Sequence, residues 1–144
     1  MKLLFVCTGN TCRSPMAAAL MNKISKENKI DVVSTSAGIF AEVGSGASEN
    51  AVLAMESYGI DISGHKARQL SEEIIADADI VLTMTEGHKM MIEAYAPEKI
   101  FSLYEFIGSY GDIADPFGGD IEEYQETASE LYSVLDEVVE VLVQ

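Results

Sequence analysis

The 144-residue sequence predicts an α/β fold: a single domain, residues 1–144, with a doubly wound sheet of four parallel strands and helices on both faces. Two observations support this prediction. Short, almost wholly apolar runs alternate along the chain with segments whose apolar residues recur every three to four positions. Nearly continuous apolar runs are typical of strands that are buried on both faces, as in parallel sheets.

Four segments are predicted as strands. The first is the apolar run KLLFV, residues 2–6, and the others cover residues 31–38, 79–84 and 99–103. Ligands of such folds bind beyond the carboxyl ends of the strands. The turn that follows the first strand is therefore the first place to look for a functional site.

The first helix is expected over residues 16–28, with Ser14 as its N-cap and Pro15 at its first position, where a missing N–H costs nothing. Three further helices are expected over residues 47–60, 71–78 and 86–95. Ser71 begins the second of these with a capping box. A loop rich in Gly and Asp, residues 108–120, leads into a final helix. Its apolar stripe consists of Leu131, Val134, Leu135, Val138, Val139 and Leu142.

The composition excludes several classes of protein. The formal net charge of −15 argues against binding to nucleic acid or to an anionic membrane. No apolar run approaches the ~18 residues of a membrane span or resembles a signal peptide. Two cysteines cannot build a disulfide scaffold, and the two His and two Cys are not spaced for zinc. We expect a soluble, cytoplasmic monomer without a metal or other cofactor.

The turn after the first strand has the sequence CTGNTCRS, with five residues between Cys7 and Arg13. Gly9 and Asn10 tolerate the positive φ that curls a backbone, so that successive N–H groups point inward and form a nest for an anion. The helix N-terminus adds its positive end, and Arg13 offers a planar fork of donors to two phosphate oxygens. There is no G-x-x-x-x-G-K-[ST] pattern that would imply a nucleotide or Mg²⁺. The predicted phosphate-binding residues are Thr8, Gly9, Asn10, Thr11, Cys12, Arg13 and Ser14.

Cys7 ends the strand, so its sulfur is expected beneath this cradle, where the same donors favour the thiolate. A thiolate under a bound phosphate is an in-line nucleophile, and the donors also stabilise the equatorial oxygens of the transferring group. A buried cysteine at a strand end is otherwise only a small apolar residue. Its position between an apolar strand and a capped helix favours catalysis.

The stretch FVCTGNTCRSPMA closely resembles the active-site loop of the low-molecular-weight protein tyrosine phosphatase family. STSAG, HKARQL and DPFGGD resemble three further motifs of the family in the same order, so the resemblance covers the whole chain. It implies a four-stranded parallel sheet and a metal-independent reaction through a cysteinyl-phosphate intermediate. Cys7 would be the nucleophile and Arg13 the catalytic arginine.

A carboxylic acid is needed to protonate the leaving group and then to activate water. Asp112, Asp115 and Asp120 compete for this role on chemistry alone, and a loop aspartate is usually a turn former. Asp115 precedes Pro116, which restricts it to an extended conformation. The resemblance to the Asp-Pro of the family selects Asp115.

Several polar residues are predicted to support the loop. By resemblance, its shape is held by the side chains of Asn10, Ser36 and His65. Without the resemblance, His65 would be interpreted as an ordinary loop histidine. Ser14 combines two roles: it caps the helix, and its hydroxyl donates to the thiolate of the nucleophile. His88 matches no family position and is expected on a helix surface.

Cys12 is the second cysteine of the loop. A curled loop brings its sulfur near Cys7, and a thiolate beside a resolving thiol is the pattern of reversible oxidation. The alternative is that Cys12 is only a small residue that fits the loop.

Two features indicate phosphoarginine rather than phosphotyrosine as the substrate. Thr11 stands where tyrosine phosphatases of the family carry a bulkier aliphatic residue, and its hydroxyl suits a guanidine. The loop continues after the Asp-Pro with Phe117 and two glycines, where tyrosine-specific members have tyrosines. CTGNTCRSPMA, SAGIFA and DPFGG together resemble the bacterial protein arginine phosphatase branch, in which the threonine and the acid recognise the guanidinium. Phe40 is expected to line the apolar side of this substrate pocket, and Phe117 to form part of its wall.

Other functions stay open on the sequence alone. The main alternative is a protein tyrosine phosphatase of the same family, and either enzyme has phosphorylated proteins as partners. A non-catalytic phosphoprotein-binding module would not need both Cys7 and Asp115. An arsenate reductase on this fold would need more cysteines, and a phosphocarrier of a sugar-uptake system would not need Arg13.

Overall fold

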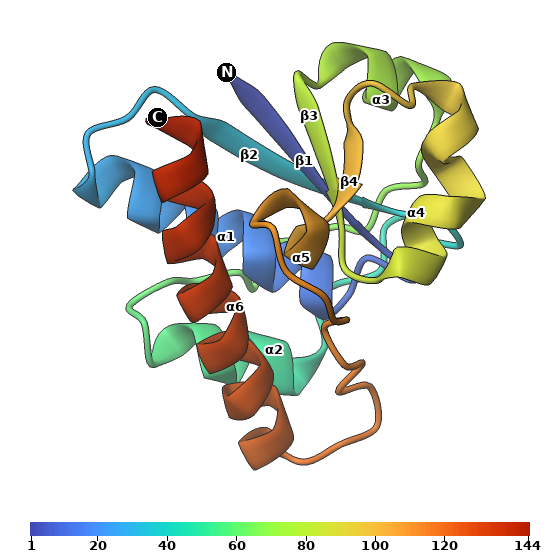
Figure 1. Cartoon of the computed structure of the whole chain (residues 1–144). Helices are drawn as coiled ribbons and strands as arrows, with labels where there is room; N and C mark the ends of the chain where they lie inside the picture. Colours follow the sequence, from blue (N-terminus) through green and yellow to red (C-terminus); the bar gives the residue numbers. More distant parts are fainter.

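The computed structural model describes all 144 residues and confirms the predicted α/β architecture. Four parallel strands form one sheet in the order β2-β1-β3-β4 (Figure 1). The strands are β1 (Lys2–Cys7), β2 (Val33–Gly38), β3 (Ile80–Thr83) and β4 (Ile100–Ser102). The helices are α1 (Arg13–Glu27), α2 (Glu49–Glu56), α3 (Glu72–Asp77), α4 (Glu86–Ile92), α5 (Leu103–Phe106) and α6 (Ile121–Leu142), and a 3₁₀ turn, η1 (Glu93–Tyr95), follows α4.

The helices form a layer on each face of the sheet. Helices α1, α2, α5 and α6 cover one face, and α3 and α4 cover the other (Figure 1). In β1, Leu3, Phe5 and Cys7 point into the first of these cores, whereas Leu4 and Val6 point into the second. Because β1 is buried on both faces, it has no polar side, which explains its continuous apolar run.

The strand order predicts where on the sheet a binding site lies, namely beside the carboxyl end of β1. The chain runs from β1 to β2 and then crosses back over β1 to β3, so that β1 and β3 are neighbours whose connections leave in opposite directions. A crevice forms at such a switch point, outside the carboxyl ends of the strands. Cys7 is the last residue of β1 and Thr83 the last of β3, so the segments that follow both strands meet at this edge.

The start of α1 differs from the prediction. The helix begins at Arg13, so Cys12 occupies the N-cap position without a capping hydrogen bond from its side chain, and Ser14 is not the cap. Pro15 therefore lies at the third helical position, which is still among the first four residues whose N–H groups lack a partner within the helix. Ser71 is the N-cap of α3 as predicted, because its hydroxyl accepts a hydrogen bond from the backbone N–H of Ile74. The predicted capping box was wrong, because the third helical position is Ile74 and not a glutamate. No helix combines the length and the apolarity that crossing a lipid bilayer requires.

Candidate active site

Residues 7–14, which we call the 7–14 loop, join β1 to α1 at the carboxyl edge of the sheet. Asn10 has a positive φ of 59°, whereas the φ of Gly9 is not positive. The loop lies directly on Gly38, the last residue of β2. A Cβ atom on Gly38 would lie 2.7 Å from the carbonyl oxygen of Thr8, so only glycine allows this close approach.

Asn10 holds the curl of the 7–14 loop together from within. Its buried side-chain amide donates to the hydroxyls of Ser14 at 2.8 Å and Ser36 at 2.9 Å. Its side-chain oxygen accepts from the backbone N–H of Arg68 at 3.0 Å, and its carbonyl oxygen lies 2.7 Å from Nε2 of His65. Hydrogen bonds thus join Asn10 to Ser36 and to His65, the three residues that were predicted to hold the shape of the loop.

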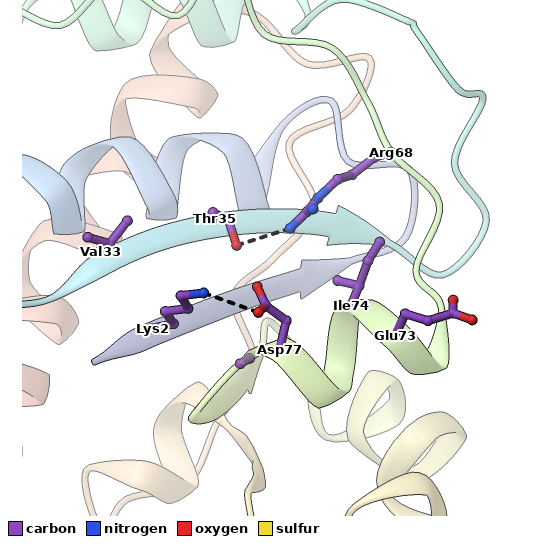
Figure 2. Close-up of a pocket in the computed structure, with 8 residues that line it drawn as sticks. Lys2, Val33, Thr35, Arg68, Glu73, Ile74 and Asp77 are labelled. Atoms are coloured by element: carbon purple, nitrogen blue, oxygen red, sulfur yellow. Dashed lines mark hydrogen bonds and ion pairs between the residues drawn. The ribbon is translucent and has the colours of Figure 1, made fainter.

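Arg68 also ties this support to the sheet. Its guanidinium donates to the carbonyl oxygen of Ser36 at 2.8 Å. It also donates to the hydroxyl of Thr35 on β2 at 3.0 Å (Figure 2). Arg68 and Thr35 line a cavity of about 330 Å³, in which Lys2 and Asp77 form an ion pair of 3.1 Å. Three of the charged side chains that line this cavity, Lys2, Asp77 and Arg68, have partners on the protein. The bonds of Arg68 thus fix its guanidinium against β2.

Cys7 is buried, and its sulfur lies 2.9 Å from the hydroxyl oxygen of Ser14. Because that oxygen already accepts a hydrogen bond from Asn10, the Ser14 proton is free to be donated to the sulfur. The Ser14 hydroxyl is thus a hydrogen-bond donor directed at the sulfur. Arg13, at the start of α1, lines the same cavity as Cys7.

Arg13 lines a second cavity of about 230 Å³ together with Cys7. One end of its buried guanidinium donates to the carbonyl oxygen of Ile113 at 2.9 Å, and the other end lies 3.5 Å from a carboxylate oxygen of Asp115. The cavity is lined by Cys7, Thr8, Gly9, Thr11, Cys12, Arg13, Asp115 and Phe117. The structure thus brings together the three predicted catalytic residues, which lie up to 108 positions apart in the sequence.

The three candidate acids have different surroundings. Asp112 accepts from the first backbone N–H of α4 at 2.8 Å, and Asp120 caps α6 by accepting from a backbone N–H in its first turn at 3.0 Å. Asp115 alone of the three lines the cavity, with its side chain half exposed. Since the other two are engaged in holding helix ends, Asp115 is the acid in reach of a bound group.

The predicted substrate-pocket residues are only partly brought together. Thr11 and Phe117 line the cavity with Cys7, as expected. Phe40 does not line it, and its ring is 69% exposed. Its backbone N–H donates to the carbonyl oxygen of Thr8 at 2.9 Å, so the chain passes beside the loop while the side chain points to solvent. The expectation that Phe40 forms a wall of the cavity was therefore wrong.

Cys12 lies on the inner side of the loop, against α2 and α6. Its sulfur is 3.3 Å from the hydroxyl of Tyr124 and 3.5 Å from that of Ser48, and both cysteines are free thiols. Burial of the ring, together with the hydrogen bond to Cys12, raises the pKa of Tyr124 to about 12. The phenol therefore stays protonated and remains a hydrogen-bond donor beside this sulfur.

His88 was expected on a helix surface, and this prediction was wrong. Its ring is only 7% exposed, and its Nε2 lies 2.9 Å from the hydroxyl oxygen of Thr8. Burial, with the Arg13 guanidinium nearby, lowers the pKa of His88 from 6.5 to about 4, although Asp112 and Asp115 act in the opposite direction. The sequence held one usable signal: His88 follows β3 by five positions, at the edge where the 7–14 loop follows β1.

Known proteins that this chain resembles are described as phosphatases. Residues 2–144 match the family described as low molecular weight phosphotyrosine protein phosphatase. The chain is 49% identical to a protein-arginine-phosphatase of Geobacillus stearothermophilus, over 98% of this chain and 95% of that protein. It is 35% identical to the low molecular weight protein-tyrosine-phosphatase PtpB of Staphylococcus epidermidis, over 96% of each chain. Among solved structures, it resembles the YwlE arginine phosphatase in a cysteine-to-serine mutant with a phosphorylated active-site serine, with a TM-score of 0.95 at 40% identity over 100% of this chain and 97% of that one.

Proposed function

The chain belongs to the low molecular weight phosphotyrosine protein phosphatase family, and on this basis we propose that it is a protein phosphatase that removes the phosphoryl group from arginine side chains. The relative from Geobacillus stearothermophilus, 49% identical over nearly the whole chain, is a protein-arginine-phosphatase. The observation that carries the proposal is the presence of Cys7, Arg13 and Asp115 around one cavity at the switch point of the sheet.

In the first step, the thiolate of Cys7 attacks phosphorus and forms a thiophosphate. Arg13, the backbone N–H groups of the loop and the N-terminus of α1 stabilise the equatorial oxygens. Asp115 donates a proton to the leaving guanidine nitrogen. The phosphorylated serine in the cysteine-to-serine mutant of YwlE supports a covalent intermediate at this position.

In the second step, Asp115 acts as a base and takes a proton from the water that attacks the thiophosphate. The S–P bond breaks and the sulfur leaves as a thiolate. The hydroxyl of Ser14, 2.9 Å from the sulfur, stabilises this leaving group. Inorganic phosphate then leaves, and the donors that bound the substrate are free for the next turnover.

The cavity wall favours arginine over tyrosine. Thr11 contributes a hydroxyl and Asp115 a carboxyl group to the same cavity. An oxygen of each can accept a hydrogen bond from an N–H group of a guanidine, also while Asp115 carries the proton that it donates to the leaving nitrogen. A phenyl ring would instead need apolar walls on both sides, and Phe117 provides only one. The net charge of −15 also suits substrates with arginine-rich, basic surroundings. We place the reaction in the cytoplasm, where thiols stay reduced, and in a monomer.

The test is a comparison of kcat/KM on two peptides of one sequence, phosphorylated on arginine in one and on tyrosine in the other. We expect turnover of the phosphoarginine peptide to be faster by at least about tenfold, and absent in a Cys7→Ser variant. The opposite preference would identify a tyrosine phosphatase. Binding without turnover of either peptide would identify a phosphoprotein-binding module.

A further inference from the structure

His88 joins α4 to the 7–14 loop through one hydrogen bond. It is the third residue of α4, and its backbone N–H donates to the capping hydroxyl of Thr85 at 3.0 Å. Its buried ring reaches Thr8, whose exposed side chain lines the cavity beside Cys7. The imidazole therefore contacts the hydroxyl of a residue that lines the cavity.

The surroundings of the ring determine which nitrogen carries the proton. Nδ1 of His88 is buried and has no hydrogen-bond partner. A buried N–H without an acceptor is rarer and costlier than an acceptor without a donor. The proton therefore belongs on Nε2, which donates to the oxygen of Thr8 at 2.9 Å.

A hydroxyl that accepts in this way keeps its own proton for a second partner. The other groups around the cavity that can bind an anion, Arg13 and the loop N–H groups, are all donors. We propose that His88 is a positioning residue of the reaction, which turns the hydroxyl of Thr8 into a hydrogen-bond donor directed at the phosphoryl oxygens in the cavity. This inference rests on the proposed phosphatase activity and adds one donor to the phosphate site.

The charges around His88 keep it in the neutral form that this role needs. Arg13 of α1 faces the ring as a cation, and a protonated imidazole would also carry a buried N–H on Nδ1 without an acceptor. Asp112 and Asp115, on the loop before α6, are the acidic groups that face it and only partly compensate. The donor therefore persists through the neutral pH range, and polarisation by the imidazole strengthens the bond that Thr8 donates.

A double-mutant cycle tests the proposal, with inorganic phosphate as the probe of binding. His88→Leu and Thr8→Val each remove one partner, and we expect each to weaken phosphate inhibition and to lower kcat/KM by about tenfold. The double variant should be no worse than either single one, because His88 acts through Thr8. His88→Gln and Thr8→Ser keep a donor and a hydroxyl, and should restore most of the loss.

Two results would overturn the proposal. One is additivity, with the double variant about a hundredfold impaired, because a histidine that only packs would act equally in both backgrounds. The other is unchanged phosphate affinity in Thr8→Val. If His88→Leu does not fold, ¹⁵N NMR of the wild-type imidazole still decides, because a proton on Nδ1 would exclude the donor role. Phosphate binding and the tautomer of His88 can be measured whichever peptide is the substrate. A wild-type protein that turned over neither peptide would therefore contradict the proposed function, but it would leave the test of His88 intact.

Discussion

The sulfur of Cys7 and the hydroxyl oxygen of Ser14 lie 2.9 Å apart, and both side chains are buried. The same hydroxyl accepts from Asn10, which is itself bonded to Ser36. A chain of hydrogen bonds thus ends on the sulfur of Cys7 and directs one donor at it.

We expect Ser14→Ala to lower kcat by about tenfold or more, because the thiolate loses a donor when it leaves the thiophosphate. The second chemical step should become slower than the first, so a pre-steady-state burst of released arginine should appear in quenched-flow measurements. Ser25→Ala is a matched control in the same helix, since the Ser25 hydroxyl is also buried but has no partner. A drop in kcat without a burst would show that Ser14 does not act on the second step.

We expect Asp115→Ala to lower kcat by about 10²- to 10⁴-fold, because both proton transfers lose their acid and base. Asp120→Ala is the control from the same loop. It should cost about 1 kcal/mol in the free energy of unfolding through the lost cap of α6, with kcat nearly unchanged. Denaturant unfolding and steady-state kinetics on both variants separate the two roles. Equal losses of kcat would mean that the loop conformation, and not the Asp115 carboxyl, matters.

We expect Thr11→Ile to lower turnover of the phosphoarginine peptide and to raise that of the phosphotyrosine peptide, with the ratio of the two kcat/KM values changing by about tenfold or more. The side chain lines the cavity, so its hydroxyl is replaced by an apolar wall that suits a ring. Thr11→Ser, which keeps the hydroxyl, should keep the preference for arginine. An unchanged ratio in Thr11→Ile would remove Thr11 from the recognition of the substrate.

The lowered pKa of His88 predicts a loss of stability in mild acid. The folded protein holds this residue neutral down to about pH 4, whereas the unfolded chain protonates it near pH 6.5. The unfolded state therefore binds more protons between these values, and the contribution of His88 is full above pH 6.5 and lost as the pH falls toward 4. This amounts to about 2 to 3 kcal/mol.

Urea unfolding at pH 7 and pH 4.5 measures this effect. The difference in the free energy of unfolding between the two values should be smaller in His88→Gln than in the wild type, because glutamine does not titrate. The same difference in both proteins would show that His88 is protonated in the folded state already near pH 6.5.

We expect hydrogen peroxide to inactivate the protein and thiols to restore it. The Cys7 thiolate is oxidised to a sulfenic acid, which condenses with the thiol of Cys12 to give a disulfide and water. Cys12→Ser should make the loss irreversible at high peroxide, because nothing then protects the sulfenic acid. Activity assays before and after dithiothreitol test this. Recovery in Cys12→Ser but not in the wild type would contradict the role of Cys12.

The local sequence was sufficient for the fold and for the core of the site. Continuous apolar runs identify strands that are buried on both faces. The motif of Cys7, Arg13 and the loop glycine can be recognised from its position between one strand and the following helix. These features lie within a few residues of one another, so the chemistry of near neighbours determines them.

Contacts between distant segments depended on the tertiary structure. The chemistry of the residues alone could not separate Asp115 from Asp112 and Asp120, because the difference is which helix ends lie nearby. Only the resemblance to the Asp-Pro of the family selected Asp115. It misplaced His88 and Phe40, because the burial of a single side chain depends on how the segments after β3 and β2 pack around the loop after β1. Periodicity reports which face of an element is buried, but only packing between elements decides which polar atom meets which.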